Sequence, residues 1–370
     1  MKVALVHDWL TGMRGGEKVL EQLVRLHPEA PIYTLVHERG SVSELIESRE
    51  IHTSFIQRLP GRAAYRWYLP LFPLAIKRLH PGPVDLVLSS SHCAAKAIIT
   101  EPETLHLCYC HTPMRYAWDQ FDVYFSPQRQ GWIRYAAIRT LIPWLRRWDK
   151  RTASRVDAFA ANSHYVAARI RRYYDRDAVV IPPPVDTALF TPSGQPPAEY
   201  WLMVTALSPY KRLGAAIDAF NRSGRKLLIA GWGPDQDRLE AQAGTSVRFL
   251  GKVDDATLVD LYQRCRGLLL PGVEDAGIAP LEAMACGRPA LVLNEGGAPE
   301  AVIEGETGLY IAAPTPEAIE AAVDSAERLK FNTDRIRAHA ERYAPEIFRQ
   351  RVREFTEQAL AGQCGLGRAP

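Results

Sequence analysis

Two glutamates, Glu274 and Glu282, stand with seven residues between them around a loop that contains Gly277. Carboxylates accept hydrogen bonds from sugar hydroxyls, so the pair fits a ligand with hydroxyl groups on both sides of the loop. Pro280 suits the first position of a helix, which we expect over 281–286, because its missing N–H is not needed there. A loop that enters a helix N-terminus binds phosphate. These residues predict a diphosphate held between a sugar and a ribose.

The backbone of the same loop supplies the predicted phosphate contacts. The N–H groups of Ala276, Gly277 and Ile278 precede the helix, where the positive end of the helix dipole attracts an anion. Glu282 also has a simpler interpretation, as an acid in the first helical turn that interacts favourably with the dipole. The ordered run of Glu, Gly, Pro and Leu-Glu-Ala is more specific than any one of its residues.

Two further segments predict contacts to the same kind of ligand. Lys211 and Arg212 follow a strand expected at 200–205 and open a helix, where they can neutralise a diphosphate. A lysine without such context is usually only solvated. Gly15 and Gly16 follow the first expected strand and also open a helix, so they allow close approach to phosphate or sugar. A tight strand–helix turn is the alternative for this glycine pair.

A histidine with polar and aromatic neighbours follows another expected strand, 105–110. His111, Arg115 and Trp118 lie within nine residues at its carboxyl end. Ligands bind at such ends in open α/β sheets, and polar loop residues indicate function more strongly than core residues do. A buried histidine with satisfied hydrogen bonds is the alternative interpretation of His111.

Buried strand patterns alternate with helical ones along the chain, which predicts an α/β protein with parallel sheets. A proline-rich crossing near 182 separates two rounds of this alternation. We therefore expect an N-terminal domain at 1–182 and a C-terminal domain at 183–344. A final helix, 345–361, is expected to return to the first domain, and a disordered tail is expected at 362–370.

The stretch from Glu274 to Glu282 resembles the signature of the retaining family 4 glycosyltransferases, also called group 1, which have a Glu-x7-Glu motif. The segment from Cys110 to Trp118 resembles that of mannosyltransferases in this family that use GDP-mannose. The resemblance covers essentially the whole chain. It departs from the family at Ala276, where Phe is usual, and at Ala206, where Arg is usual.

The resemblance implies a GT-B fold, with two facing Rossmann-like domains and the active site in the interdomain cleft. It implies transfer of a hexose, with mannose from GDP-mannose preferred, to a glycan or lipid-linked saccharide in cell-surface polysaccharide biosynthesis. The catalytic residues would be His111, Lys211 and Glu274. Asp8 would stand with Arg115 and Trp118 on the acceptor side.

No cofactor and no metal ion are expected, because the sequence lacks an Asp-x-Asp metal pair. Another nucleotide-linked hexose, such as rhamnose or glucose, is the alternative sugar donor. A GT-B nucleotide-sugar hydrolase or epimerase is the alternative from another class, because one scaffold hosts several activities. A sugar-binding subunit without activity is disfavoured by the presence of both glutamates and the cations.

Charge is distributed unevenly along the chain. Residues 1–182 carry 25 Lys and Arg against 17 Asp and Glu, whereas residues 183–370 carry 20 against 25. The basic, tryptophan-bearing segment 128–155 predicts either contact with an anionic membrane surface or a core helix with a solvated basic face. No nucleic-acid-binding motif is present.

The location is expected to be cytoplasmic, with peripheral contact at the inner face of the cell membrane. The N-terminus is predicted to be a strand rather than a secretion signal. The six cysteines show no zinc-binding spacing, which favours a reducing compartment.

Overall fold

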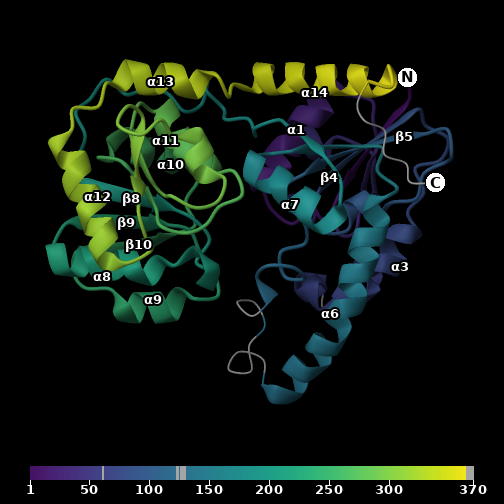
Figure 1. The fold of residues 1–370 in the computed structure, drawn as a ribbon, viewed down its shortest axis with the longest axis horizontal. Coiled ribbons are helices and arrows are strands. Elements are labelled where there is room, and N and C mark those ends of the chain that lie inside the picture. Colours follow the sequence, from purple (N-terminus) through teal and green to yellow (C-terminus); the bar gives the residue numbers. More distant parts are fainter. Residues whose placement is uncertain (61, 122–124, 126–130, 364–370) are drawn as a thin grey trace. The chain divides into compact units, whose positions relative to one another are not determined.

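The structure is a computed structural model that describes the chain except residues 61, 122–124, 126–130 and 364–370 (Figure 1). The chain divides into two compact units. The first comprises Met1–Pro183 and Phe348–Pro370, and the second comprises Pro184–Ile347. Part of the segment expected to contact membrane, 128–130, and most of the predicted disordered tail lie outside the described residues.

The first unit is built on a seven-stranded sheet of order β3-β2-β1-β4-β5-β6-β7, in which all neighbours are parallel. Its strands are short apolar runs that are mostly buried, as expected where helices cover both faces of a parallel sheet. They are β1 (Val3–His7), β2 (Ile32–Thr34), β3 (Ile51–Thr53), β4 (Leu86–Ser91), β5 (Leu105–Cys110), β6 (Ala158–Ala161) and β7 (Ala178–Val180).

Alternate residues of the central strand β1 enter different cores on opposite faces of this sheet. The main helices are α1 (Gly15–Leu26), α3 (Phe72–Lys77), α6 (Trp132–Ala153), α7 (His164–Tyr174) and α14 (Pro345–Leu360), with a short α2 (Glu44–Glu47). In β1, Ala4 and Val6 join the core formed with α3 and α6, while Val3 and Leu5 join the core formed with α1 and α14.

The last helix, α14, packs on the first unit. Its buried side chains Phe348, Val352 and Phe355 are spaced three or four residues apart and enter the same core as α1. Phe348 meets the ring of Tyr109 edge-on at 5.5 Å between centroids. Chain segments at opposite ends of the sequence therefore share one hydrophobic core.

The second unit repeats the plan with a six-stranded parallel sheet of order β10-β9-β8-β11-β12-β13. The strands are β8 (Tyr200–Val204), β9 (Lys226–Ala230), β10 (Val247–Gly251), β11 (Leu268–Leu270), β12 (Ala290–Leu293) and β13 (Gly308–Ile311). The helices are α8 (Leu213–Ser223), α9 (Gln236–Gln242), α10 (Asp255–Arg264), α11 (Ile278–Ala285), α12 (Pro316–Arg328) and α13 (Thr333–Glu341).

The predicted fold class, α/β with two parallel-sheet Rossmann-like domains, is confirmed. Two helix starts differ from the sequence prediction. The helix α11 begins at Ile278, so Pro280 occupies its third position, where an N–H is still not needed. The helix α8 begins at Leu213, after Lys211 has ended a short 3-10 turn. Among the described residues, none of the helices is both apolar enough and long enough to span a bilayer.

Candidate active site

An ion pair joins two of the predicted site residues in the second unit. The Nζ atom of Lys211 donates to Oε1 of Glu274. Lys211 follows β8 and Glu274 follows β11, and these strands are neighbours in a parallel sheet, so both loops leave its carboxyl edge. The lysine is only 8% exposed, and a cation this deeply buried requires a charged partner.

Glycines let three loops meet around this ion pair. A Cβ added to Gly272 would lie 2.6 Å from the carbonyl oxygen of Lys211, and one added to Gly296 would lie 2.6 Å from that of Glu274. The carbonyl of Glu274 also accepts from the N–H of Gly297 at 2.7 Å. The loop at 294–297 was not among the predicted site residues, although two adjacent glycines after β12 were a signal for it.

The N-terminus of α11 adjoins the same loops. Gly277 precedes the helix in the left-handed region, with φ of +71°, and its added Cβ would lie 3.0 Å from that of Ala298. Only glycine meets both demands without strain. Ala276 and Ile278, on either side, are half-buried. The predicted phosphate contact is therefore a constrained turn that presents backbone N–H groups at the start of a helix.

Glu282 lies deeper than the ion pair. It is the fifth residue of α11 and so lies beyond the first turn where it was expected, because the helix starts earlier, at Ile278. Its side chain is 6% exposed, and its Oε2 accepts from the hydroxyl of Tyr262 at 2.8 Å. Burial and the charge of Glu282 raise the pKa of Tyr262 well above its usual value, so the phenol stays protonated as the donor of this hydrogen bond.

Arg212 differs from its neighbour Lys211. It adopts the left-handed conformation at φ of +55°, and its exposed guanidinium lies 3.8 Å from Glu295. An exposed ion pair of this kind is worth little and breaks readily. Ala206, which stands where the family usually has arginine, is exposed as well.

In the first unit, Gly16 brings α1 close to His111. An added Cβ at Gly16 would lie 3.7 Å from Nε2 of His111 and 3.4 Å from Cε1 of His7. Gly15 is the first residue of that helix. Burial, followed by the neighbouring charges of His92, His7 and Arg115, lowers the pKa of His111 well below its usual value. His111 is therefore a neutral imidazole near neutral pH.

Asp8 is fully buried, and both oxygens of its carboxylate accept hydrogen bonds from the backbone of the protein. Oδ2 accepts from the N–H groups of His92 and Cys93, and Oδ1 accepts from those of Ala94 and Ala95, at 2.5–2.9 Å. His92 Nδ1 lies 3.0 Å from Oδ2 as well. The structure thus places Asp8 beneath the loop that follows β4.

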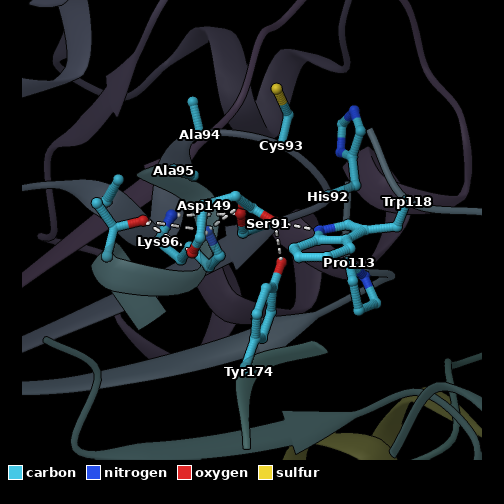
Figure 2. Close-up of polar contacts among 12 residues, drawn as sticks. Ser91, His92, Cys93, Ala94, Ala95, Lys96, Pro113, Trp118, Asp149 and Tyr174 are labelled. Atoms are coloured by element: carbon cyan, nitrogen blue, oxygen red, sulfur yellow. Dashed lines mark hydrogen bonds and ion pairs between the residues drawn. The ribbon is translucent and has the colours of Figure 1, made fainter. Parts of the chain in front are cut away.

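Trp118 is anchored in a similar way (Figure 2). Its Nε1 donates at 2.8 Å to Asp149, a buried carboxylate that also pairs with Lys96 at 2.6 Å and accepts from Tyr174 at 2.9 Å. The Trp118 ring stacks on Tyr173 at 4.6 Å. This network fixes the end of the loop that carries His111 and Arg115, and Arg115 itself is half-buried there.

The structure thus gathers the predicted residues into two sets. Lys211, Arg212, Glu274, Glu282 and the 276–278 turn surround the carboxyl edge of the second sheet, and His111, Arg115 and the Gly15-Gly16 turn surround that of the first. No group of three or more His, Cys, Asp or Glu is placed to hold a metal ion in the described part of the chain.

Two protein-family models match these two halves of the chain. Residues 13–189 match glycosyltransferase family 4, and residues 191–346 match the glycosyl transferases group 1. In fold, the chain is similar to HepE of Anabaena, solved in complex with UDP and glucose, with a TM-score of 0.70 over 96% of this chain and 99% of that one at 18% identity. The fold is therefore GT-B, and the chain belongs to the group 1 glycosyltransferases.

Curated relatives in this family use different sugars. The chain is 29% identical over 231 residues to a GDP-mannose-dependent phosphatidylinositol dimannoside mannosyltransferase of Mycobacterium tuberculosis, over 58% of each chain. It is 34% identical over 132 residues to the D-rhamnosyltransferase WbpZ of Pseudomonas aeruginosa, over 34% of this chain and 35% of that one. The matched regions span less than two thirds of either relative.

We expect Asp8→Asn to lower the free energy of unfolding of the first unit by about 3 kcal/mol. An amide would turn an N–H group toward backbone N–H groups that now donate to a carboxylate, and bonds to charged groups are worth about 1.5–3 kcal/mol each. Urea denaturation followed by circular dichroism measures the loss.

The matched control is Asp85→Asn. Asp85 also accepts a backbone N–H, from Lys2 at 2.6 Å, but it is exposed, so the loss should stay below about 1 kcal/mol. Equal, small losses in both variants would show that the Asp8 carboxylate does not hold the 92–95 loop.

Proposed function

We propose that the protein is a retaining hexosyltransferase that moves a sugar from a nucleoside diphosphate to a hydroxyl of a glycan or polyprenyl-linked saccharide. We place this reaction in cell-surface polysaccharide biosynthesis. The observation that carries the proposal is the Lys211–Glu274 pair beside the N-terminus of α11. The lysine can bind a phosphate and the adjacent carboxylate can bind sugar hydroxyls. In a nucleotide sugar, the phosphate and the sugar are joined by one bond, so the two groups of the protein fit such a ligand.

The departing nucleoside diphosphate gathers negative charge as the glycosidic bond breaks. In the proposed mechanism, Lys211 and the N–H groups of the 276–278 turn stabilise that charge, because they are fixed before the reaction begins. Arg212, exposed and only loosely paired, supplies a second cation where Ala206 leaves one missing. Glu274 accepts hydrogen bonds from hydroxyls of the transferred sugar.

Glu282 is proposed to hold the ribose. Its Oε2 is bound to Tyr262, so the carboxylate is fixed in orientation before it meets a ligand. In the first unit, His111 is proposed to orient the sugar and to steady the positive charge that develops on it. Attack from the face that the phosphate leaves would retain the anomeric configuration without a covalent intermediate.

On the acceptor side, the proposed direct contact is Arg115. The polar atoms of Asp8 and Trp118 form hydrogen bonds with other residues of the protein. We therefore propose that these two side chains position the loops that follow β4 and β5. These loops would shape the acceptor site without touching the acceptor through those atoms.

GDP-mannose is the proposed sugar donor. The 110–118 segment and the similarity to a GDP-mannose-dependent mannosyltransferase support it. Rhamnose and glucose donors are the alternatives, in line with the rhamnosyltransferase relative. We further propose that neither a metal ion nor a cofactor takes part, because Lys211 and the backbone N–H groups at the start of α11 would stabilise the phosphate charge without one.

The first test is an assay of the purified protein with GDP-mannose, a GDP-rhamnose donor and UDP-glucose, in the presence of a polyprenyl-linked saccharide. We expect GDP-mannose to react fastest, EDTA to leave the rate unchanged, and NMR of the product to show the anomeric configuration of the donor. Inhibition by EDTA that Mg²⁺ or Mn²⁺ reverses would overturn the metal-free mechanism. Full-rate release of free sugar without acceptor would identify a hydrolase instead.

Lys211→Ala is expected to lower kcat by about 10²-fold, the usual effect of removing one pre-organised group that stabilises transition-state charge. Steady-state kinetics with saturating sugar donor measures it. The matched control is Lys226→Ala, an exposed lysine of the same unit that lies 3.8 Å from Glu199 and should leave kcat unchanged. Equal rates for both variants would remove Lys211 from the mechanism.

We also propose that the first unit rests on an anionic membrane surface at the cytoplasmic face. The helix α6 exposes Trp132, Ile133 and Trp144, at 75%, 88% and 42%, and its N-terminal part extends beyond the sheet in Figure 1. The helix α3 and the turn before it add exposed apolar side chains, among them Trp67 and Leu74, and pack against the same core as α6. Apolar side chains beside basic ones fit an anionic lipid surface.

Vesicle sedimentation tests this contact. The protein should bind anionic vesicles at low salt and release as salt rises, because each Lys or Arg near such a surface contributes about 1 kcal/mol that salt screens. Replacing Arg139, Arg147, Lys150 and Arg151 with Gln should abolish binding. Arg146 is spared, because it donates to backbone oxygens of the loop that ends at Trp118.

The control for the vesicle experiment removes as many exposed charges from other helices of the first unit, α7 and α14: Arg171, Arg172, Arg351 and Arg353. Vesicle binding should survive in this variant. Equal binding of the wild type to neutral and anionic vesicles would contradict the membrane proposal and would favour the simpler interpretation of α6 as a core helix with a solvated face.

A further inference from the structure

A chain of polar side chains leads from α1 to His111. The hydroxyl of Ser90 lies 2.7 Å from Nε2 of His111 and 3.1 Å from Nδ1 of His7. On the far side of the His7 ring, Nε2 lies 3.6 Å from Oε1 of Glu17. His7, Ser90 and Glu17 are all buried. None of these three belongs to the predicted site.

One hydroxyl between two imidazole nitrogens imposes a rule on their protons. Ser90 has a single hydrogen, and within the described residues its hydroxyl has no partner other than these two rings, so that hydrogen forms a bond only if Ser90 donates to one ring and accepts from the other. When both rings are neutral, the nitrogen of His7 and the nitrogen of His111 that face Ser90 are therefore in opposite states. The tautomer of one ring then determines the tautomer of the other.

Glu17 selects one of the two arrangements. Burial raises the pKa of this carboxyl, but its contact with His7 outweighs that effect, so the pKa lies below its usual value and Glu17 is ionised near neutral pH. A carboxylate only accepts hydrogen bonds, so it favours a proton on Nε2 of His7. Nδ1 of His7 then accepts from Ser90, and Ser90 accepts from Nε2 of His111.

We propose that Glu17, His7 and Ser90 are positioning residues that hold His111 with its proton on Nε2 and a free electron pair on Nδ1. His111 is half-buried, and its Nδ1 makes no hydrogen bond within the described residues. That nitrogen is then an acceptor for a hydroxyl group. On the proposed function, this hydroxyl belongs to the transferred sugar. His111 then accepts a hydrogen bond from a sugar hydroxyl and does not donate one to it.

Glu17→Gln should reverse the direction of each hydrogen bond along the chain from residue 17 through His7 and Ser90 to His111. Oε2 of Glu17 accepts from the N–H of Arg14 at 3.1 Å, so the oxygen of the new amide keeps that position. The amide N–H₂ then takes the place of Oε1 and faces Nε2 of His7. It donates there, His7 carries its proton on Nδ1, Ser90 donates to His111, and His111 is left with its proton on Nδ1.

Nitrogen-15 NMR of the histidine-labelled protein reads these states directly, because protonated and bare ring nitrogens differ widely in chemical shift. At a pH high enough for both rings to be neutral, we expect His7 and His111 both protonated on Nε2 in the wild type and both on Nδ1 in Glu17→Gln. The control Glu21→Gln, one turn further along α1, should match the wild type. A wild-type His111 with its proton on Nδ1, or no change in Glu17→Gln, would overturn the proposal.

Ser90→Ala provides a second variant should Glu17→Gln fail to fold. Without the hydroxyl the two rings are uncoupled, so His111 should show a mixture of tautomers while His7 keeps its proton on Nε2. A His111 that stays entirely protonated on Nε2 would show that Ser90 does not transmit the state of His7.

Kinetics separates this proposal from the proposed function. Glu17→Gln should lower kcat about tenfold with little change in KM for the sugar donor, as for one hydrogen bond made in the transition state. The tautomer measurement needs no substrate. A correct tautomer pattern in a protein that transfers no sugar would refute the function and keep the relay, whereas normal transfer with the wrong pattern would refute the relay alone.

Discussion

Parallel pairing of the strands is the constraint on which both units depend. Every strand delivers its carboxyl end to the same edge of its sheet, so the loops that leave neighbouring strands must meet there. In the second unit this brings Lys211 and Glu274 into contact, although 63 positions separate them in the sequence. In the first unit it brings His7, Ser90 and His111 together from three neighbouring strands or the residues just after them. Polar side chains collect at these edges because helices pack their apolar faces against the rest of each sheet.

Burying charge at such an edge costs free energy unless each charge finds partners. Asp8 meets this requirement through backbone N–H groups, and Lys96 through the carboxylate of Asp149. Neither arrangement is expected to stabilise the fold more than well-packed apolar residues would. Both fix the position of a loop, since the hydrogen bonds have definite directions that apolar contacts lack. In both of these cases buried charge serves to place a loop.

The two departures from the family pattern have different structural settings. Ala276 lies in a turn whose contribution comes from the backbone, so the loss of a phenylalanine side chain leaves the N–H groups of that turn in place. Ala206 is exposed and leaves no charged group behind. In the proposed mechanism Arg212 takes the place of that cation, because its guanidinium is exposed and only weakly held by Glu295. On the proposed function, the two changes would alter the shape of the sugar site more than the binding of phosphate.

The sequence by itself determined the parallel α/β plan and the residues at the edge of the second sheet, because strand periodicity, glycines and a helix start are local patterns. It also indicated the histidine segment after β5. The family resemblance predicted Asp8 and Trp118 on the acceptor side, but a sequence cannot tell which hydrogen bonds a polar side chain makes. Only the tertiary structure placed the Asp8 carboxylate beneath the 92–95 loop and the Trp118 indole on Asp149. It alone placed the hydroxyl of Ser90 between His7 and His111, because His7 and Ser90 are 83 positions apart and become neighbours only when β1 pairs with β4.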